Sequence, residues 1–263
     1  MKTLITNDDG IASEGLWLLA DAFQPMGEVV IAAPDREQSA VGTAVTLRRP
    51  LKVTRQKAPE ADVDGVQAYA VNGTPSDCVI LGLDKLAGGG VSLVVSGIND
   101  GLNCGEDVLI SGTVSAALQA YLRGFPAIAV SVPLGAYGRL GAAAAKMATG
   151  LAGNLFGSDS LADVFLNINL PDESLKGIKG VRVTRLATRS HHNTVAETKR
   201  GEEIEYTLIR EKTAHCTDQT TDVWAVENGY VSVTPLYTRH FDKSLLPSID
   251  RLGNQLSRQI TER

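Results

Sequence analysis

The sequence has few of the residues on which several classes of protein depend. Its 263 residues include three cysteines, four histidines and 5% aromatic residues. The cysteines stand far apart, at positions 78, 104 and 216, without CxxC spacing. This spacing argues against a disulfide framework and against a thiolate zinc site. A reducing compartment, the cytoplasm, is therefore the expected location.

A basic charge balance and a long apolar run are also missing. The net charge is −5, whereas binding to duplex nucleic acid depends on Lys and Arg side chains that neutralise phosphates, so we expect no such partner. No apolar run approaches the length of about 20 residues that spans a membrane. The first residues lack the basic region and apolar core of a secretion signal. We expect neither export nor a membrane partner.

Two common phosphate-binding sequences do not occur. The chain has no GxxxxGK[ST] segment, which excludes a P-loop, and no GxGxxG after a strand. The second absence weakens an oxidoreductase interpretation, because a dinucleotide cofactor needs that fingerprint. A phosphate site in this chain would have to be built in another way.

The sequence does contain alternating β-like and helical segments. The helical segments are 14–24, a segment that begins near Pro75, 112–123 and 142–155. The β-like runs between them are 2–6, 29–33, 91–95, 127–132 and 164–170, and 47–54 with 66–71 reads as a hairpin set to one side. This alternation predicts an α/β fold with a Rossmann-like, doubly wound and mostly parallel sheet.

After Pro171 the pattern changes to alternating β-branched and charged residues. Runs 181–186 and 203–210 predict antiparallel strands with one wet face, and 191–201 reads as an exposed loop or hairpin tip. Further predicted elements are a short helix at 218–228, a strand at 230–233 and a terminal helix at 245–260 with an apolar stripe. We expect an α/β core in residues 1–170 and a C-terminal portion in 171–263, within one domain overall.

Oxygen-bearing side chains gather where three of the predicted strands end. Strand 2–6 runs into Asp8 and Asp9, strand 29–33 is followed by Ser39, and strand 91–95 is followed by Asn99. Adjacent carboxylates repel each other unless a cation lies between them, and such oxygen ligands select Mg²⁺ or Mn²⁺ over zinc. Ligands bind at this edge of open α/β sheets. The pattern favours a divalent metal site, although a hydrogen-bonded turn would explain the aspartates taken alone.

The segment after the third strand favours a phosphate site. Glycines such as Gly97 let the backbone approach a ligand, and Asn103 offers an amide. The segment ends at Ser111, Gly112 and Thr113, where hydroxyls and backbone N–H groups at a helix start can hold a phosphate. An ordinary serine N-cap is the alternative.

Taken together, these segments resemble the SurE family, the survival protein E nucleotidases, along essentially the whole chain. The motifs that carry the resemblance occur in the order ITNDDG, APDREQSA, NGTPSDCV, SGINDGLNCGED and SGTVSAA. The resemblance implies a phosphatase of nucleoside 5′- and 3′-monophosphates. It also implies that one divalent cation per subunit is held by the residues Asp8, Asp9, Ser39 and Asn99.

Further expectations come from the same resemblance. It implies that Ser111 to Thr113 lie by the phosphate and that Asn72 borders the active-site cleft. It also implies a homodimer or homotetramer in which the C-terminal portion reaches a neighbouring subunit. Ile110, Ser115 and the pair Gln119-Ala120 depart from the usual family residues, which affects the expected shape of the substrate pocket more than the metal site.

The residue inventory predicts hydrolysis by a metal-activated water, with Asp8 and Asp9 as the catalytic carboxylates. Attack by an aspartate carboxylate through a phospho-enzyme is the competing mechanism. Two other functions remain open, an exopolyphosphatase acting on short polyphosphate and a non-catalytic nucleotide-binding module. No general acid is identified, because the histidines read as surface or structural residues.

Overall fold

A computed structural model gives the fold and describes residues 1–57, 66–156, 164–174, 176–188, 191–201, 203–212 and 216–237. Within them, nine strands form one sheet: β1 (Lys2–Thr6), β2 (Glu28–Pro34), β3 (Val53–Gln56), β4 (Gln67–Val71), β5 (Leu93–Asp100), β6 (Ala127–Val132), β7 (Phe165–Asn169), β8 (Val181–Val183) and β11 (Val231–Pro235). Their spatial order is β3-β4-β2-β1-β5-β6-β7-β11-β8. The α/β prediction with a mostly parallel sheet is confirmed.

The centre of the sheet is parallel and its margins are mixed. Strands β4, β2, β1, β5, β6 and β7 pair in parallel, and their central residues, such as Leu4 and Ile5, are fully buried. Burial on both faces explains why these strands read as continuous apolar runs. At the margins, β3 is antiparallel to β4 and β11 is antiparallel to β7. The expected hairpin at 47–71 is therefore part of the main sheet and not set to one side, because β4 pairs with β2.

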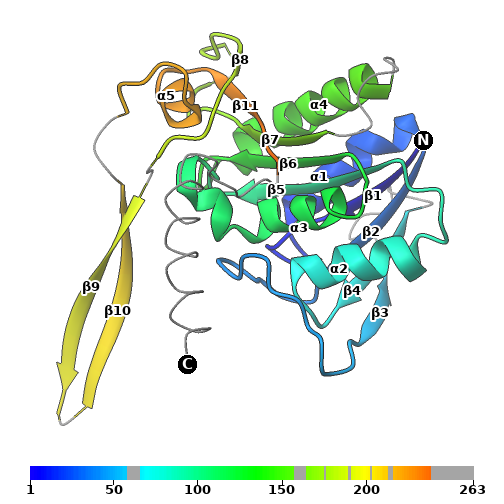
Figure 1. The fold of residues 1–263 in the computed structure, drawn as a ribbon, viewed down its shortest axis with the longest axis horizontal. Coiled ribbons are helices and arrows are strands. Elements are labelled where there is room, and N and C mark those ends of the chain that lie inside the picture. The colour runs from blue at the N-terminus through cyan, green and yellow to red at the C-terminus, as the bar shows by residue number, and fades with distance from the viewer. Residues whose placement is uncertain are drawn as a thin grey trace, which may run out of the picture.

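Helices cover both faces of the sheet (Figure 1). Helices α1 (Glu14–Phe23) and α4 (Tyr137–Phe156) pack on one face, and α2 (Pro75–Leu81) and α3 (Gly112–Tyr121) on the other. The shorter elements are η1 (Gln24–Met26), η2 (Gly82–Leu86), η3 (Gly105–Leu109) and α5 (Asp222–Glu227). Among the described helices, none is both long and apolar enough to cross a membrane.

Helix α2 begins where the sequence predicts, at Pro75. The Thr74 hydroxyl accepts from the Asp77 backbone N–H at 3.1 Å, and the Asp77 carboxylate accepts from the Thr74 N–H at 2.9 Å. This reciprocal capping box satisfies two backbone donors at the helix start. Asp77 also accepts from the Thr46 N–H at 2.8 Å, so the same carboxylate fixes the segment before β3.

Strand β5 differs from its prediction, because it continues five residues beyond Val95 to Asp100. Its pairing with β6 shifts between Ser96 and Asn99 and then resumes with Asn99 opposite Ser131. At Gly97 the backbone has a φ of 138°, and a Cβ there would lie 2.4 Å from the carbonyl oxygen of Val130. The glycine therefore marks an irregularity inside a strand and not its end.

The C-terminal portion contains the expected antiparallel hairpin, in a different form. Residues 191–201 are not a loop or a tip, because β9 (His191–Arg200) pairs along its whole length with β10 (Glu203–Lys212). The hairpin extends away from the sheet (Figure 1). The run at 181–186 yields only the short β8, which is parallel to β11 and not antiparallel. The helix expected at 245–260 lies outside the described residues.

Candidate active site

The candidate site lies where β1 and β5 stand side by side at the centre of the sheet. From β1 the chain crosses to β2 on one side, and from β5 it crosses to β6 on the other, so the direction of winding reverses between them. Such a reversal opens a crevice at the carboxyl ends of the strands. A pocket of about 420 Å³ occupies this position, lined by Asp8, Asp9, Glu37, Ser39, Ala40, Asn99, Asp100, Leu102, Asn103, Asp107, Ile110, Ser111, Leu134 and Arg210.

Asp8 lies at the floor of the pocket, directly after β1, and is only 4% exposed. The hydroxyl of Thr113 in the first turn of α3 donates to Asp8 Oδ1. A side chain at Gly112 would have no room, because a Cβ there would lie 2.6 Å from the Cβ of Asp8. Burial raises the pKa of Asp8 from 3.8 to about 6, against the opposing effect of the Thr113 hydrogen bond.

Asp9 is held from the opposite side. The hydroxyl of Tyr137, the first residue of α4, lies 2.8 Å from Asp9 Oδ2 and also reaches the carbonyl oxygen of Ile98. Burial raises the pKa of Asp9, while the Tyr137 hydrogen bond lowers it. Burial also raises the pKa of Tyr137, so this residue stays a neutral donor. No motif marks Tyr137 in the sequence, because it lies 128 residues from Asp9 and only the fold brings them together.

The two neutral oxygen ligands expected from the sequence are both in the pocket wall. Ser39 donates its hydroxyl hydrogen to Glu37 Oε1 at 2.6 Å, which leaves the oxygen lone pairs to face other groups. The amide nitrogen of Asn99 donates to the carbonyl oxygen of Gly101 at 2.6 Å. This hydrogen bond uses the amide nitrogen and leaves the Asn99 side-chain oxygen as an acceptor.

Ser111 and Asn103 also line the pocket, and each is fixed by the protein. Ser111 is the N-cap of α3, and its hydroxyl accepts from the Val114 N–H at 3.1 Å. Asn103 donates from its side chain to Ser131 Oγ at 2.9 Å, and its backbone N–H donates to Asn169 Oδ1 at 2.8 Å. Ser111 therefore acts as an ordinary helix N-cap, and the start of α3 also lies at the pocket.

Other residues expected at the site do not line this pocket. Thr113 and Gly112 lie behind Asp8, as described above. Gly97 lies inside β5, where the absence of a side chain permits close approach to the carbonyl oxygen of Val130. Asn72 donates to Asp35 Oδ2 at 3.0 Å and accepts from Arg49 at 3.0 Å, in the loops that follow β4 and β2.

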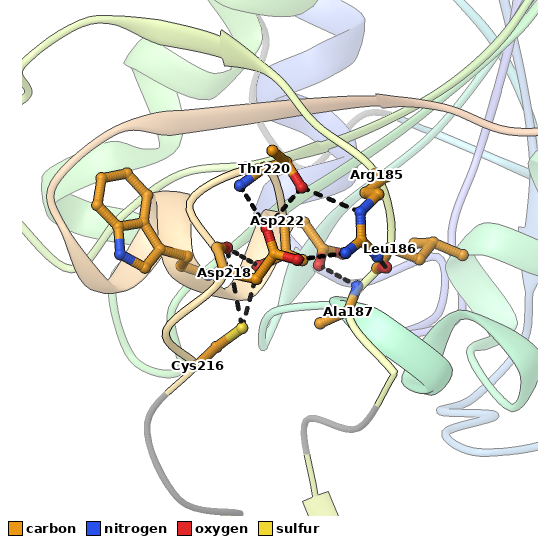
Figure 2. A network of polar contacts seen from close by, with 9 residues as sticks. Arg185, Leu186, Ala187, Cys216, Asp218, Thr220 and Asp222 are labelled. Carbon is orange, nitrogen blue, oxygen red and sulfur yellow. Dashed lines mark hydrogen bonds and ion pairs between the residues drawn. The ribbon is translucent and has the colours of Figure 1, made fainter.

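A buried carboxylate fixes the loop that forms the far wall. Asp222, at the start of α5, accepts from the backbone N–H of Gly105 at 2.8 Å and of Ala187 at 2.9 Å. Figure 2 shows Asp222 within a wider network in which Arg185 contacts Asp218 and Thr220, with Cys216 close by. Through this network the segments on either side of the β9–β10 hairpin are tied to the wall of the pocket.

The donor chemistry of the pocket suits a hard cation. Five of its lining residues are carboxylates. Asp8 is buried and the adjacent Asp9 is half-buried, and both have raised pKa values. A cation between them would attract both carboxylates and so offset the repulsion and the lost hydration that raise these pKa values. In the described part of the chain, no cluster of three or more His, Cys, Asp or Glu is arranged to hold a metal. The expected set differs in kind, because it combines two carboxylates with a hydroxyl and an amide.

Comparison with known proteins gives a consistent family. The family model described as survival protein SurE matches residues 3–193. A protein named 5′-nucleotidase SurE from Dehalococcoides mccartyi is 49% identical over 245 residues, covering 92% of this chain and 91% of that protein. Another of that name, from Aeromonas hydrophila, is 40% identical over 262 residues, covering 98% of this chain and 100% of that protein.

A solved structure agrees with the sequence comparisons. The crystal structure of SurE protein from Aquifex aeolicus superimposes with a TM-score of 0.80 at 36% identity. The match covers 96% of this chain and 100% of that one. The chain belongs to the survival protein SurE family.

Proposed function

We propose that this protein is a metal-dependent phosphatase that hydrolyses nucleoside 5′- and 3′-monophosphates to nucleoside and phosphate. The observation that carries the proposal is the pair of adjacent carboxylates, Asp8 and Asp9, at the sheet edge where ligands bind. The curated relatives named 5′-nucleotidase SurE support the same reaction class, phosphoric monoester hydrolysis.

In this proposal Asp8, Asp9, Ser39 and Asn99 hold one Mg²⁺ or Mn²⁺. Such a cation supplies positive charge to phosphoryl oxygens and lowers the pKa of water. The hydrogen bonds from Thr113 and Tyr137 hold the two carboxylates in place before a ligand arrives. Fixed ligands of this kind need no reorganisation during the reaction.

The start of α3 is the proposed phosphate contact. Ser111 lines the pocket as the N-cap, and backbone N–H groups of a first helical turn favour an anion. Water is the proposed nucleophile, because Asp8 is buried and its Oδ1 is already engaged by Thr113, which disfavours direct attack by this carboxylate. Asn103, whose side chain donates to Ser131, lines the same pocket.

The test is phosphate release from nucleoside 5′- and 3′-monophosphates with Mn²⁺, with Mg²⁺ and with a chelator. We expect turnover with either metal and loss of turnover with the chelator. Short polyphosphate run in parallel tests the exopolyphosphatase alternative. Binding of nucleotide without release of phosphate, in the presence of both metals, would favour the non-catalytic module and contradict the proposal.

We also propose a homo-oligomer, a dimer at least, located in the cytoplasm. The location is supported by the three cysteines, none of which forms a disulfide. Assembly is supported by the β9–β10 hairpin, whose strands pair only with each other among the described strands. Its apolar side chains Val195, Tyr206 and Leu208 are 60%, 64% and 75% exposed, which a second subunit would cover.

A further inference from the structure

The base of the β9–β10 hairpin reaches the pocket. Arg210 on β10 lines it, and Arg210 is paired with Asn193 in the hairpin register. His191 lies two residues before Asn193, so its side chain is on the same face of the hairpin as that of Arg210. Both side chains contact Asp107 in the pocket wall: His191 Nδ1 lies 2.6 Å from Asp107 Oδ2, and the Arg210 guanidinium contacts Asp107 Oδ1.

Charge makes Arg210 distinctive within the pocket. The charged residues that line it are five carboxylates and this one guanidinium, as far as the described residues show. A nucleoside monophosphate is an anion and would be repelled by the carboxylates, even after a single divalent cation has offset part of their charge. Arg210 is therefore the side chain of the wall that attracts such a ligand.

The geometry leaves part of the guanidinium available to a ligand. The Arg210 side chain is 38% exposed, whereas that of Asp107 is 12% exposed. A guanidinium carries five N–H donors in a planar fork, and its contact with Asp107 is through one terminal nitrogen. An arginine held on one edge by a buried carboxylate can present its other edge to a second anion.

The segments that lead into the hairpin fix its position relative to the pocket. The backbone N–H groups of Ala187, before β9, and of Gly105, two residues before Asp107, donate to different oxygens of the same carboxylate, Asp222. Asp218, after β10, pairs with Arg185 (Figure 2). The base of the hairpin is thus tied to the same loop that carries Asp107.

We propose that Arg210 is a substrate-binding residue that contacts the phosphoryl oxygens of the nucleotide, with Asp107 and His191 as the residues that position it. This inference rests on the proposed function and deepens it. The competing explanation is that Arg210 only anchors the hairpin through its ion pair with Asp107. The two explanations differ in whether phosphate affinity depends on Arg210.

The first experiment compares Arg210→Gln and Arg210→Lys with the control Arg200→Gln. Arg200 lies at the far end of β9, where its Nε is 3.5 Å from Glu205, so the control removes the same charge from the same hairpin. We measure kcat and KM for a nucleoside 5′-monophosphate and the inhibition constant of inorganic phosphate, each with Mn²⁺. Oligomeric state and melting temperature are measured for every variant.

For Arg210→Gln we expect KM and the phosphate inhibition constant to rise about tenfold or more, and by a larger factor than kcat falls. Arg210→Lys keeps the charge without the planar fork, so it should recover part of the loss. Arg200→Gln should match the wild type. Unchanged phosphate inhibition in Arg210→Gln would overturn the inference and leave the anchoring role.

A second experiment uses the wild-type protein and does not depend on folding of a variant. An arginine-directed dicarbonyl reagent is applied with and without inorganic phosphate and Mn²⁺, and modified peptides are quantified by mass spectrometry. Phosphate should slow modification of Arg210 and leave Arg200 unaffected. Equal rates at Arg210 with and without phosphate would overturn the inference. Absence of any hydrolysis by the wild type would instead contradict the proposed function, whereas phosphate protection tests the Arg210 contact separately.

Discussion

The hydroxyl of Tyr137 lies 2.8 Å from Asp9 Oδ2 and joins the first residue of α4 to the loop after β1. Close packing makes this contact possible. A Cβ at Gly15 would lie 2.8 Å from the Tyr137 ring and 2.4 Å from the carbonyl oxygen of Ile98, so α1 must carry a glycine there for Tyr137 to approach. The contact fixes Asp9 and, because it favours the charged carboxylate, opposes the effect of burial on its pKa.

Replacing Tyr137 with Phe should therefore raise the pKa of Asp9 and weaken metal binding most at low pH. We expect the pH dependence of activity to move to higher pH and activity near pH 6 to fall roughly three- to tenfold, with a smaller loss at pH 8. The measurement is kcat/KM against pH at fixed Mn²⁺. Tyr230→Phe, in the stack with Trp224, is the control. An equal loss at every pH would contradict this role of the hydroxyl.

Asp8→Asn and Asp9→Asn should each reduce metal-dependent phosphatase activity to below about 1% of wild type while the fold is kept. The reason is that each variant removes one negative charge from a site proposed to hold a cation. Phosphate release is measured with saturating Mn²⁺, and circular dichroism checks the fold. Wild-type turnover in either variant would rule out the metal assignment.

Most of the sheet could be predicted because its strands are buried on both faces. Runs such as 2–6 and 127–132 coincide with β1 and β6 for this reason. Strand β9 is not predicted by the sequence, because its residues are polar and largely exposed and no apolar alternation marks it. The sequence predicts too early an end for β5, because Gly97 and Asn99 are typical of a turn, whereas the strand pairing of Asn99 with β6 depends on a distant segment.

The site was predictable in part for a similar reason. Asp8, Asp9 and Ser39 follow their strands, Asn99 lies at the end of β5, and the structure brings all four to one pocket. Tyr137 and Arg210 carry no local signal, since each reaches the pocket through long-range packing. Their contacts join residues 128 and 103 positions apart in the sequence, which a motif cannot encode.

Ser39→Ala and Asn99→Ala should weaken metal affinity less than the loss of a carboxylate does. Both remove neutral ligands, which contribute to geometry more than to charge. We expect activity against Mn²⁺ concentration to shift to higher metal concentration by roughly three- to thirtyfold, with turnover recovered at saturation. If both variants followed the wild-type curve, the proposed ligand set would be wrong.

The raised pKa of Asp8 predicts how the metal-free protein responds to pH. Because the folded-state pKa of about 6 exceeds the ordinary value of 3.8, the folded protein binds this proton more tightly than the unfolded chain does. The associated stability is present at low pH and is lost as pH rises through about 6. Metal binding requires the deprotonated carboxylate, so Mn²⁺ affinity should rise over the same interval.

Thermal melts with a chelator test this sign. Asp8→Asn should have a melting temperature close to that of the wild type at about pH 4 and a higher one at pH 7, because the amide has no charge to bury. The corresponding difference in the free energy of unfolding at pH 7 is roughly 1–3 kcal/mol. Thr113→Val tests the neighbouring contact and should raise the Asp8 pKa further, since the Thr113 hydrogen bond lowers it. A constant difference between wild type and Asp8→Asn across this range would contradict the assignment of the pKa to Asp8.

The hairpin predicts that the protein is a homodimer at least. Leu208 is paired with Val195, and Tyr206 shares their face of the hairpin, so β9 and β10 expose an apolar strip that the main sheet does not cover. Leu208→Asp combined with Tyr206→Asp should shift the assembly toward monomer, because two charges would be buried without partners. The control is Leu47→Asp, at a loop position that is 84% exposed.

Truncation after Pro247 should give monomer or insoluble protein, because it removes most of the apolar stripe expected in the terminal segment. Light scattering at micromolar concentration is the measurement, and a monomeric intact chain would refute the assembly.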